Sequence, residues 1–264
     1  MLGLSPGLTA YLLTLTALLG LVMGSFVNCW AWRLARGQSV LRGRSRCAHC
    51  GCTLGAADLI PVLSWLLLKG RCRRCGEKIS PRYPAVELLT MGMFLALALR
   101  YDLSLEALRL SALCCLLLGA ALVDLDVMLL PDGLLAAAAA WYFLSLPLVS
   151  SAPLSALLDG LKGGALVAGP LLALVLLADR VTGRESMGGG DIKLLFVTGL
   201  YLGLPVNLLN LILSCLLGVA LGLGLRCAGR QAAPFPFGPA VVGATFLCLL
   251  FGQAAVDWYL RLFF

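Results

Sequence analysis

Apolar runs long enough to cross a lipid bilayer recur along the whole chain, and they constrain its fold more than any other feature. A helix needs about 20 apolar residues to span the hydrocarbon core. Hydrophobic residues make up 61% of the 264 positions and charged residues 12%, against about 25% charged in soluble domains. We predict spans at 7–29, 84–99, 105–123, 132–150, 161–179, 192–204, 206–225 and 239–259. The sequence therefore predicts an all-α polytopic membrane protein with about eight transmembrane helices.

The number of helices stays open between eight and seven, because Pro205 can mark either a kink in one helix or a turn between two. The first apolar run follows no basic segment and lacks a small-x-small cleavage site, so we expect it to remain as the first helix. Three domains follow: a first transmembrane helix at 1–32, a polar module at 33–83 and a helical bundle at 84–264.

The Lys and Arg residues gather in three loops. If the N-terminus is outside, the loops 30–83, 180–193 and 226–238 face the cytoplasm, and they hold sixteen of the twenty Lys and Arg residues. Such a bias follows the positive-inside rule. The net charge of +7 is therefore explained by topology and by contact with the anionic lipid of the bilayer, and we expect no nucleic-acid partner.

Two Cys-x2-Cys pairs lie in the polar module, which holds five of the eleven cysteines. Cys47 and Cys50 form the first pair, Cys72 and Cys75 form the second, and 21 residues separate them. Two such pairs can close a tetrahedral zinc site, because each tight turn supplies two thiolates. A module of about 50 residues has too small a hydrophobic core to fold stably alone, and a bound metal can supply the missing stability. The spacing predicts structural Zn²⁺ on these four cysteines.

Other uses of these cysteines compete with the zinc site. A disulfide or a redox dithiol is possible by spacing, but stable disulfides are rare in the cytoplasm, where the predicted topology places the module. Cys52 follows the first pair and His49 lies inside it, so both remain alternative ligands.

Two aspartates occur where solvation does not explain them, in "LVDLDVMLLPDGLL" and "MGGGD". On the predicted topology, Asp124 at the end of one helix and Asp191 at the start of another share one depth, at the cytoplasmic edge of the bilayer. Ionisable groups there are costly and usually functional. Two facing carboxyl groups share one proton, as in an aspartic protease. The ionised one takes a proton from the attacking water, and the protonated one hydrogen-bonds the oxyanion.

The glycines before Asp191 fit this chemistry. Gly188, Gly189 and Gly190 carry no side chains, so an extended substrate peptide can lie beside their backbone, next to Asp191. The simpler alternative is a tight turn in which Asp191 caps the following helix.

Three other acidic positions have ordinary explanations or stay open. Asp126 lies two positions from Asp124, and the sequence does not fully separate the two as the catalytic residue. Asp132 follows Pro131 at a helix start, where the helix dipole favours a carboxylate. Glu87 lies one turn into the second helix and is expected to pair with Arg82 or another loop cation.

Taken together, the motifs resemble those of the type IV prepilin peptidase family, nearly from end to end. The matching segments are "GSFVNCWAWRL" (24–34), the region 60–90 around the second cysteine pair, "DLDVMLLPD" (124–132), "ESMGGGDIKLL" (185–195) and "PFGP" (236–239). A lone GxGD is weak, whereas this ordered set is specific. Ala35 departs from the pattern, because the family usually has proline after "RL", and Cys52 blurs the assignment of zinc ligands.

The resemblance implies roles for the two aspartates. In this family the first catalytic aspartate precedes the proline of the Leu/Ile-Pro-Asp/Asn turn by seven positions, which selects Asp124 ahead of Pro131. The second is the aspartate of GxGD, here Asp191. The family cleaves the basic leaders of type IV prepilins and type II secretion pseudopilins at the cytoplasmic face of the bacterial inner membrane. Many members then methylate the new N-terminus with S-adenosylmethionine, an activity linked to the cysteine module.

Three other functions remain as alternatives to this resemblance. A presenilin-like intramembrane protease shares the GxGD motif but does not need two cysteine pairs. A non-enzymatic membrane adaptor would use zinc to hold a protein-docking loop. A transporter would use paired acidic residues to relay protons.

Overall fold

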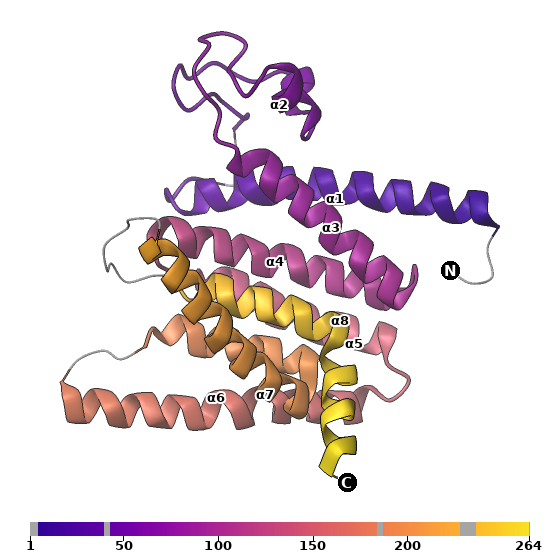
Figure 1. The fold of residues 1–264 in the computed structure, drawn as a ribbon, viewed down its shortest axis with the longest axis vertical. Coiled ribbons are helices and arrows are strands. Elements are labelled where there is room, and N and C mark those ends of the chain that lie inside the picture. The colour runs from indigo at the N-terminus through magenta and orange to yellow at the C-terminus, as the bar shows by residue number, and fades with distance from the viewer. Residues whose placement is uncertain (1–4, 40–42, 184–186, 228–235, 264) are drawn as a thin grey trace. The chain divides into compact units, whose positions relative to one another are not determined.

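The computed structural model describes residues 5–39, 43–183, 187–227 and 236–263. Their regular elements are all helical, which confirms the predicted fold class (Figure 1). The elements are α1 (Pro6–Leu34), the 3-10 helix η1 (Ala56–Leu59), α2 (Leu63–Leu67), α3 (Arg82–Tyr101), α4 (Leu105–Val127), α5 (Asp132–Val149), α6 (Pro153–Thr182), α7 (Gly189–Cys227) and α8 (Gly238–Phe263). Glu185 and the segment 228–235, which belong to predicted loops, lie outside the described residues.

Seven of the described helices, all except α2, are long and apolar enough to cross a membrane. Six of them correspond to single predicted spans. The main shift in a boundary is at α6, which begins at Pro153 instead of residue 161. Proline is favoured in the first turn of a helix, where its missing N–H costs nothing. Asp159 and Lys162 therefore lie inside α6 as an i,i+3 pair, 3.7 Å apart.

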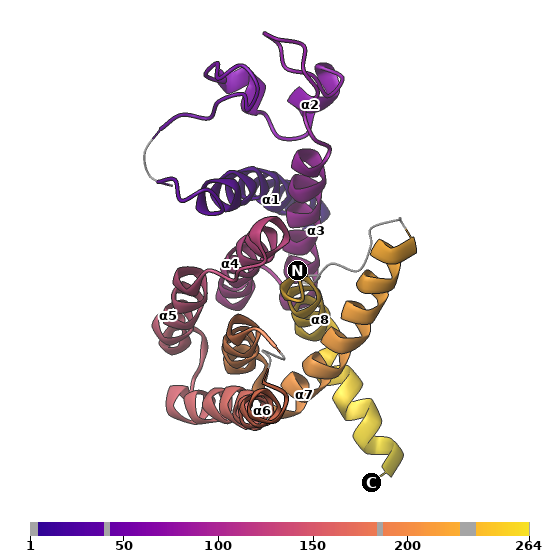
Figure 2. The same cartoon turned by 90° about the vertical axis from the view of Figure 1, so that its left-hand side faces the viewer.

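The seventh helix, α7, carries the two spans predicted at 192–204 and 206–225 as two arms. The break lies at Gly203, whose φ of 70° and ψ of 172° are accessible almost only to glycine. Asn207 Nδ2 donates to the carbonyl of Leu195 at 3.2 Å. In a straight helix these two residues would lie about 18 Å apart along the axis. The chain therefore folds back at Gly203, and Figure 2 shows the two arms as separate orange helices.

The bend explains how α7 and α8 begin at the same end of the bundle. The backbone N–H of Gly238, the first residue of α8, donates to Asp124 near the end of α4. At the start of α7, the ammonium group of Lys193 pairs with Asp132 at the start of α5. A straight α7 would carry the chain to the opposite end before α8 begins. The two arms thus act as two passes, as the eight-span prediction requires.

A buried polar network holds the bend. Asn207 also donates to the carbonyl of Gly163 in α6 at 2.9 Å, and Asn210 donates to the Thr198 hydroxyl at 3.2 Å. Thr245 of α8 donates to Asn210 at 3.3 Å. These amide and hydroxyl side chains are fully buried. In an apolar bundle such groups must bond one another, so the network fixes the angle between the arms.

The chain divides into two compact units, residues 1–115 and 116–264. Within the first, α1 packs closely on α3 at Gly20 and Gly24, where a side chain would lie within 2.7 Å of the α3 backbone. Within the second, Gly160, Gly163 and Gly164 of α6 make equally close contacts with the first arm of α7. Small residues let helices approach in membranes, where packing rather than burial from water drives association.

Candidate active site and metal centre

Asp124 lies in the last turn of α4 and is only 6% exposed. The helix ends at Val127, because Met128 takes a left-handed conformation with a φ of 54°. The Met128 N–H donates to the Asp124 carbonyl at 2.8 Å and closes the helix end. Pro131 then prevents the helix from continuing and leads into α5. The local sequence therefore places Asp124 at a buried helix terminus.

The Asp124 carboxylate is held by the start of α8. Its Oδ2 accepts a hydrogen bond from the backbone N–H of Gly238 at 2.9 Å. A hydrogen bond to a charged group is stronger than a neutral one, and the N-terminus of a helix favours a negative charge. This contact joins two segments 114 positions apart and offsets part of the cost of burying an ionised carboxylate at Asp124.

Gly238 contacts the candidate site, although the sequence did not predict a role for it. A Cβ atom at this position would lie 2.7 Å from Asp124 Oδ2 and 3.1 Å from the Leu130 side chain. Only glycine lets the α8 backbone approach the carboxylate. The signal in the sequence was the "PFGP" motif, which we used for the family resemblance without assigning a role to its glycine.

Asp191 lies in the first turn of α7 and is half-buried. The helix begins at Gly189, so Asp191 is inside the helix, and its N–H donates to the Gly188 carbonyl at 3.1 Å. Asp191 is therefore not the residue that precedes the helix. A carboxylate at the third helical position can still bond the first backbone N–H groups, and Asp191 Oδ2 lies 3.4 Å from where a Cβ atom on Gly188 would be. Gly188 and Gly189 are exposed, and a Cβ atom at Gly189 would meet nothing within 4 Å. The backbone before Asp191 is open on this side.

Leu130 connects the two aspartate segments. Its side chain is buried, and the Cβ position of Gly190 lies 3.0 Å from Leu130 Cβ. The same side chain contacts Gly238. The structure thus brings Asp124, the glycine turn before Asp191 and the start of α8 around one leucine.

The two other aspartates of this region are exposed. Asp126 is exposed, whereas Asp124 is buried, which separates two residues that the sequence left open. The Asp132 side chain is 71% exposed and pairs with Lys193 at 2.7 Å. An exposed pair of this kind contributes little stability.

The four predicted metal ligands meet in the first unit. The sulfur atoms of Cys47, Cys50, Cys72 and Cys75 all lie within 4.8 Å of one another. Cys47 Sγ and Cys75 Sγ are 3.9 Å apart. Zinc–sulfur bonds of about 2.3 Å in a tetrahedron put the sulfurs roughly 3.8 Å apart. The cluster therefore fits a tetrahedral metal ion such as Zn²⁺.

Both cysteine pairs are built by the same turn. The Cys47 N–H donates to the Cys52 carbonyl at 2.9 Å, and the Cys72 N–H donates to the Glu77 carbonyl at 2.8 Å. In each turn the residue after the second cysteine is a glycine with a positive φ, 68° at Gly51 and 73° at Gly76. The two loops therefore present their thiols in matching geometry.

The surroundings shift the pKa values of these thiols in both directions. Hydrogen bonds from the N–H groups of Cys75 and Arg74 lower the pKa of Cys72 to about 6. Burial and hydrogen bonds with neighbouring cysteines raise the pKa of Cys75 to about 12, and a hydrogen bond with Cys50 raises that of Cys52 to about 11. What distinguishes Cys52 is its position, because it does not belong to the group of four converging sulfur atoms. The geometry therefore favours the predicted ligand set over Cys52.

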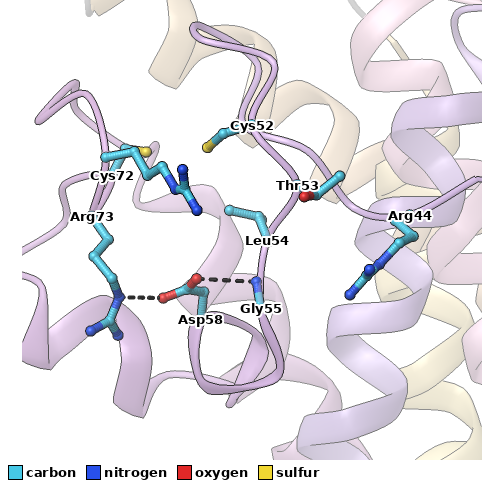
Figure 3. Close-up of a pocket in the computed structure, with 9 residues that line it drawn as sticks. Arg44, Cys52, Thr53, Leu54, Gly55, Asp58, Cys72 and Arg73 are labelled. Atoms are coloured by element: carbon cyan, nitrogen blue, oxygen red, sulfur yellow. Dashed lines mark hydrogen bonds and ion pairs between the residues drawn. The ribbon is translucent and has the colours of Figure 1, made fainter.

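A pocket of about 220 Å³ lies next to the cluster (Figure 3). Arg73 donates to Asp58 at 2.7 Å, and the Gly55 N–H donates to the other oxygen of Asp58 at 3.1 Å. These two contacts hold the pKa of Asp58 below its usual value. Cys52, Cys72 and Arg44 also line the pocket. The pair of Arg73 and Asp58 thus ties the second cysteine loop to η1.

Two family models match the chain. The bacterial peptidase A24 N-terminal domain matches residues 18–101, and the type IV leader peptidase family matches residues 111–223. The chain belongs to the type IV leader peptidase family. The first match covers the four cysteines, and the second covers Asp124 and Asp191. Gly238 lies beyond the end of both matches.

Curated relatives in this family are similar over most of their length. A prepilin leader peptidase/N-methyltransferase of Bacillus subtilis is 35% identical over 254 residues, which cover 95% of this chain and 99% of that protein. One of Aeromonas hydrophila is 38% identical, over 83% of this chain and 76% of that protein. A type 4 prepilin-like proteins leader peptide-processing enzyme of Escherichia coli is 35% identical, over 92% of this chain and 93% of that protein. No solved structure is a significant match.

Proposed function

We propose that this chain is a membrane aspartic endopeptidase that cleaves the leader peptide of type IV prepilins or pseudopilins. One observation carries the proposal: the buried Asp124 is bonded to the start of α8 at the same end of the unit as Asp191, with Leu130 between their segments. Family membership and the names of the relatives give the substrate class. A zinc-bearing adaptor or a transporter would not need this arrangement.

The surroundings of the two carboxyl groups suggest a division of roles. The Gly238 N–H stabilises Asp124 as the carboxylate, so Asp124 takes a proton from the attacking water. Asp191 holds the shared proton and donates a hydrogen bond to the oxyanion that forms on the scissile carbonyl. When the carbon–nitrogen bond breaks, a proton passes to the leaving amine, and the pair of carboxyl groups returns to its starting state.

The substrate is proposed to lie along the glycine turn. The exposed backbone of Gly188 and Gly189 offers hydrogen-bonding groups to an extended peptide beside Asp191. The prepilin helix then enters from the lipid, and its basic leader stays in the cytoplasm. This places the enzyme in the bacterial inner membrane with its active site on the cytoplasmic side, as the distribution of Lys and Arg predicts.

A second activity, methylation of the new N-terminus, is part of the proposal because the names of relatives include it. S-adenosylmethionine would supply the methyl group: the amine nitrogen bonds the methyl carbon, the sulfur keeps the electrons of its broken bond, and the amine loses a proton. Zn²⁺ on the four cysteines would have a structural role, since all four ligands are protein thiols.

The direct test replaces each of two neighbouring aspartates. Asp124→Asn keeps the size and removes the base, so leader cleavage should fall by about 10²- to 10⁴-fold. Asp126→Asn is the matched control, because Asp126 is exposed two positions away. Its cleavage rate should stay near that of the wild type. Full activity of Asp124→Asn would contradict the assignment.

A further inference from the structure

The short helix α2 of the cysteine module carries a group of exposed leucines. Leu63, Leu66 and Leu67 are 49%, 57% and 73% exposed. Their spacing of i, i+3 and i+4 places them on one face of the helix, and we call them the α2 patch. Leu59 and Ile60, which precede the helix, are exposed as well. Single exposed apolar residues are common, whereas a group on one face marks an interaction surface.

The opposite face of α2 packs on the module itself. Trp65 donates its Nε1–H to the Ile79 carbonyl at 3.1 Å, and its ring packs against Gly70. Ser64 and Leu68, on the same side, are half-buried. These contacts fix the rotation of α2 about its axis, so the α2 patch points away from the module.

A hydrogen bond places the start of α2 at the level of a membrane-spanning helix. The Val62 N–H donates to Glu87 Oε2 of α3 at 2.7 Å, and both views show α2 next to the first turns of α3 (Figures 1 and 2). Glu87 lies five residues after Arg82, about 7.5 Å along the helix axis from the start of α3. The 20 residues of α3 extend about 30 Å, which is the thickness of the hydrocarbon core. The first turns of α3 are therefore at the boundary between headgroups and acyl chains, and α2 begins at this depth.

Basic residues follow the α2 patch directly. Lys69 and Arg71 are exposed just after α2 ends at Leu67. Residues 43–81 contain seven Lys and Arg residues and two Asp and Glu residues. A Zn²⁺ ion with four thiolates adds only about two negative charges, so the module stays positive. Anionic lipid headgroups attract such a segment, whereas the basic leader of a prepilin or a second copy of the module would be repelled.

Both ends of the module are tethered to membrane-spanning helices. α1 ends at Leu34, before the module, and α3 begins at Arg82, directly after it. A helix as short as the five residues of α2 buries little apolar area and would bind a bilayer weakly by itself. Tethering makes the contact intramolecular, so a weak contact is sufficient. The small size of the α2 patch is therefore compatible with docking on the membrane.

We propose that α2 is an interfacial helix that docks the cysteine module on the surface of the membrane. The α2 patch lies among the acyl chains, and Lys69 and Arg71 contact the headgroups of anionic phospholipids. The four-cysteine cluster is thereby held close to the membrane surface instead of projecting into water. The inference rests on α1 and α3 as membrane-spanning helices, and it does not depend on the chemistry of the aspartate pair.

The test measures the depth of a fluorescent amino acid in the full-length protein. The protein is reconstituted in nanodiscs of phosphatidylethanolamine and phosphatidylglycerol that carry bromine on their acyl chains. The reporter replaces Leu66 of the α2 patch or, as a control, Ala48, which is exposed in the first cysteine turn. At position 66 the brominated lipid should quench most of the emission, and acrylamide dissolved in the water should quench little. At position 48 the order should be reversed.

Two results at position 66 would overturn the inference. Strong quenching by acrylamide without quenching by the lipid would show that the α2 patch faces water. Protection from both quenchers would show that another protein surface, from this chain or from a second copy, covers the patch.

A double substitution tests whether the apolar face holds α2 at the bilayer. Leu63→Asn together with Leu67→Asn makes the patch polar around the reporter at position 66, so quenching by the lipid should be lost. Both leucines are exposed, so the variant should fold, and its metal content and leader cleavage report this. Ala56→Asn with Ala57→Asn is the matched control, because both residues are exposed in η1 outside the patch, and quenching should persist. Unchanged quenching in the leucine variant would overturn the inference.

Discussion

At the scale of single residues, the proposed active site depends on how closely the α8 backbone approaches Asp124. The Gly238 N–H bonds the carboxylate, and the space where a side chain would begin is already occupied by Asp124 and Leu130. The residue that bonds the proposed catalytic base is therefore a glycine, and it acts through its backbone N–H.

Gly238→Ala tests this contact. The added methyl group would lie 2.7 Å from Asp124 Oδ2, so the start of α8 must shift and the hydrogen bond must lengthen. A hydrogen bond to a charged group contributes about 1.5–3 kcal/mol, and leader cleavage should fall by at least about tenfold. Gly133→Ala serves as the control, because a Cβ atom there meets nothing within 4 Å. Equal rates for both variants would show that the Gly238 contact is dispensable.

The sequence reveals those site residues whose pattern is local along the chain. Asp191 is marked by its glycines and the cysteines by their spacing, because both signals lie within a few positions. Asp124 was separated from Asp126 by resemblance alone, since helical spacing does not say which carboxylate is buried. Gly238 acts through a contact 114 positions away, and no local pattern encodes such a distance.

At the scale of elements, the cysteine module and the bent α7 show what local sequence determines. The repeated turns Cys47–Gly51 and Cys72–Gly76 are set by a few residues each, so the spacing correctly predicted that the four cysteines converge. The break in α7 was expected at Pro205, but it lies at Gly203, where only glycine tolerates the backbone angles. Proline permits a kink, whereas the left-handed glycine makes the chain turn back.

Metal content tests the cysteine module directly. Cys72→Ser should lose the zinc, because Cys72 contributes one of four converging thiols, whereas Cys52→Ser should retain about one equivalent. From the family resemblance, Cys47→Ser should impair methylation more than leader cleavage. The measurements are metal analysis of the purified variants and both activities on one prepilin. Loss of zinc from Cys52→Ser but not from Cys72→Ser would make Cys52 a ligand in place of Cys72. Equal loss of methylation and leader cleavage in Cys47→Ser would contradict a separate role of the module in methylation.

At the scale of the whole molecule, the number of passes decides on which side the active site lies. By helix length and composition, seven of the described helices can span a membrane. The contacts of Lys193 at the start of α7 and of Gly238 at the start of α8 show that the chain returns, by the end of α7, to the end of the bundle where α7 began. If the basic loops are inside, as the positive-inside rule predicts, both aspartates are expected to lie on the cytoplasmic side. The sequence alone left the number of membrane passes open between seven and eight, because composition does not reveal that α7 folds back on itself.

Reporter fusions test the topology. Alkaline phosphatase fused after Ser151 or Leu204 should be active, because both positions are predicted to lie outside the membrane. Fusions after Gly183 or Phe237 should be inactive, because these positions precede α7 and α8 on the cytoplasmic side. An active fusion after Phe237 together with an inactive one after Gly183 would mean that α7 crosses the membrane once, and it would contradict the folded-back arrangement.

The most direct test of the central claim is cleavage of one purified prepilin in detergent micelles by wild type and Asp191→Asn at matched amounts. If Asp124 and Asp191 form the catalytic pair, the wild type yields the leader-free product and Asp191→Asn yields about 10²- to 10⁴-fold less per unit time. Unchanged metal content in the variant would show that it is folded. Equal cleavage by both proteins would reduce Asp191 to a residue of the first turn of α7 and would contradict the assignment of the active site.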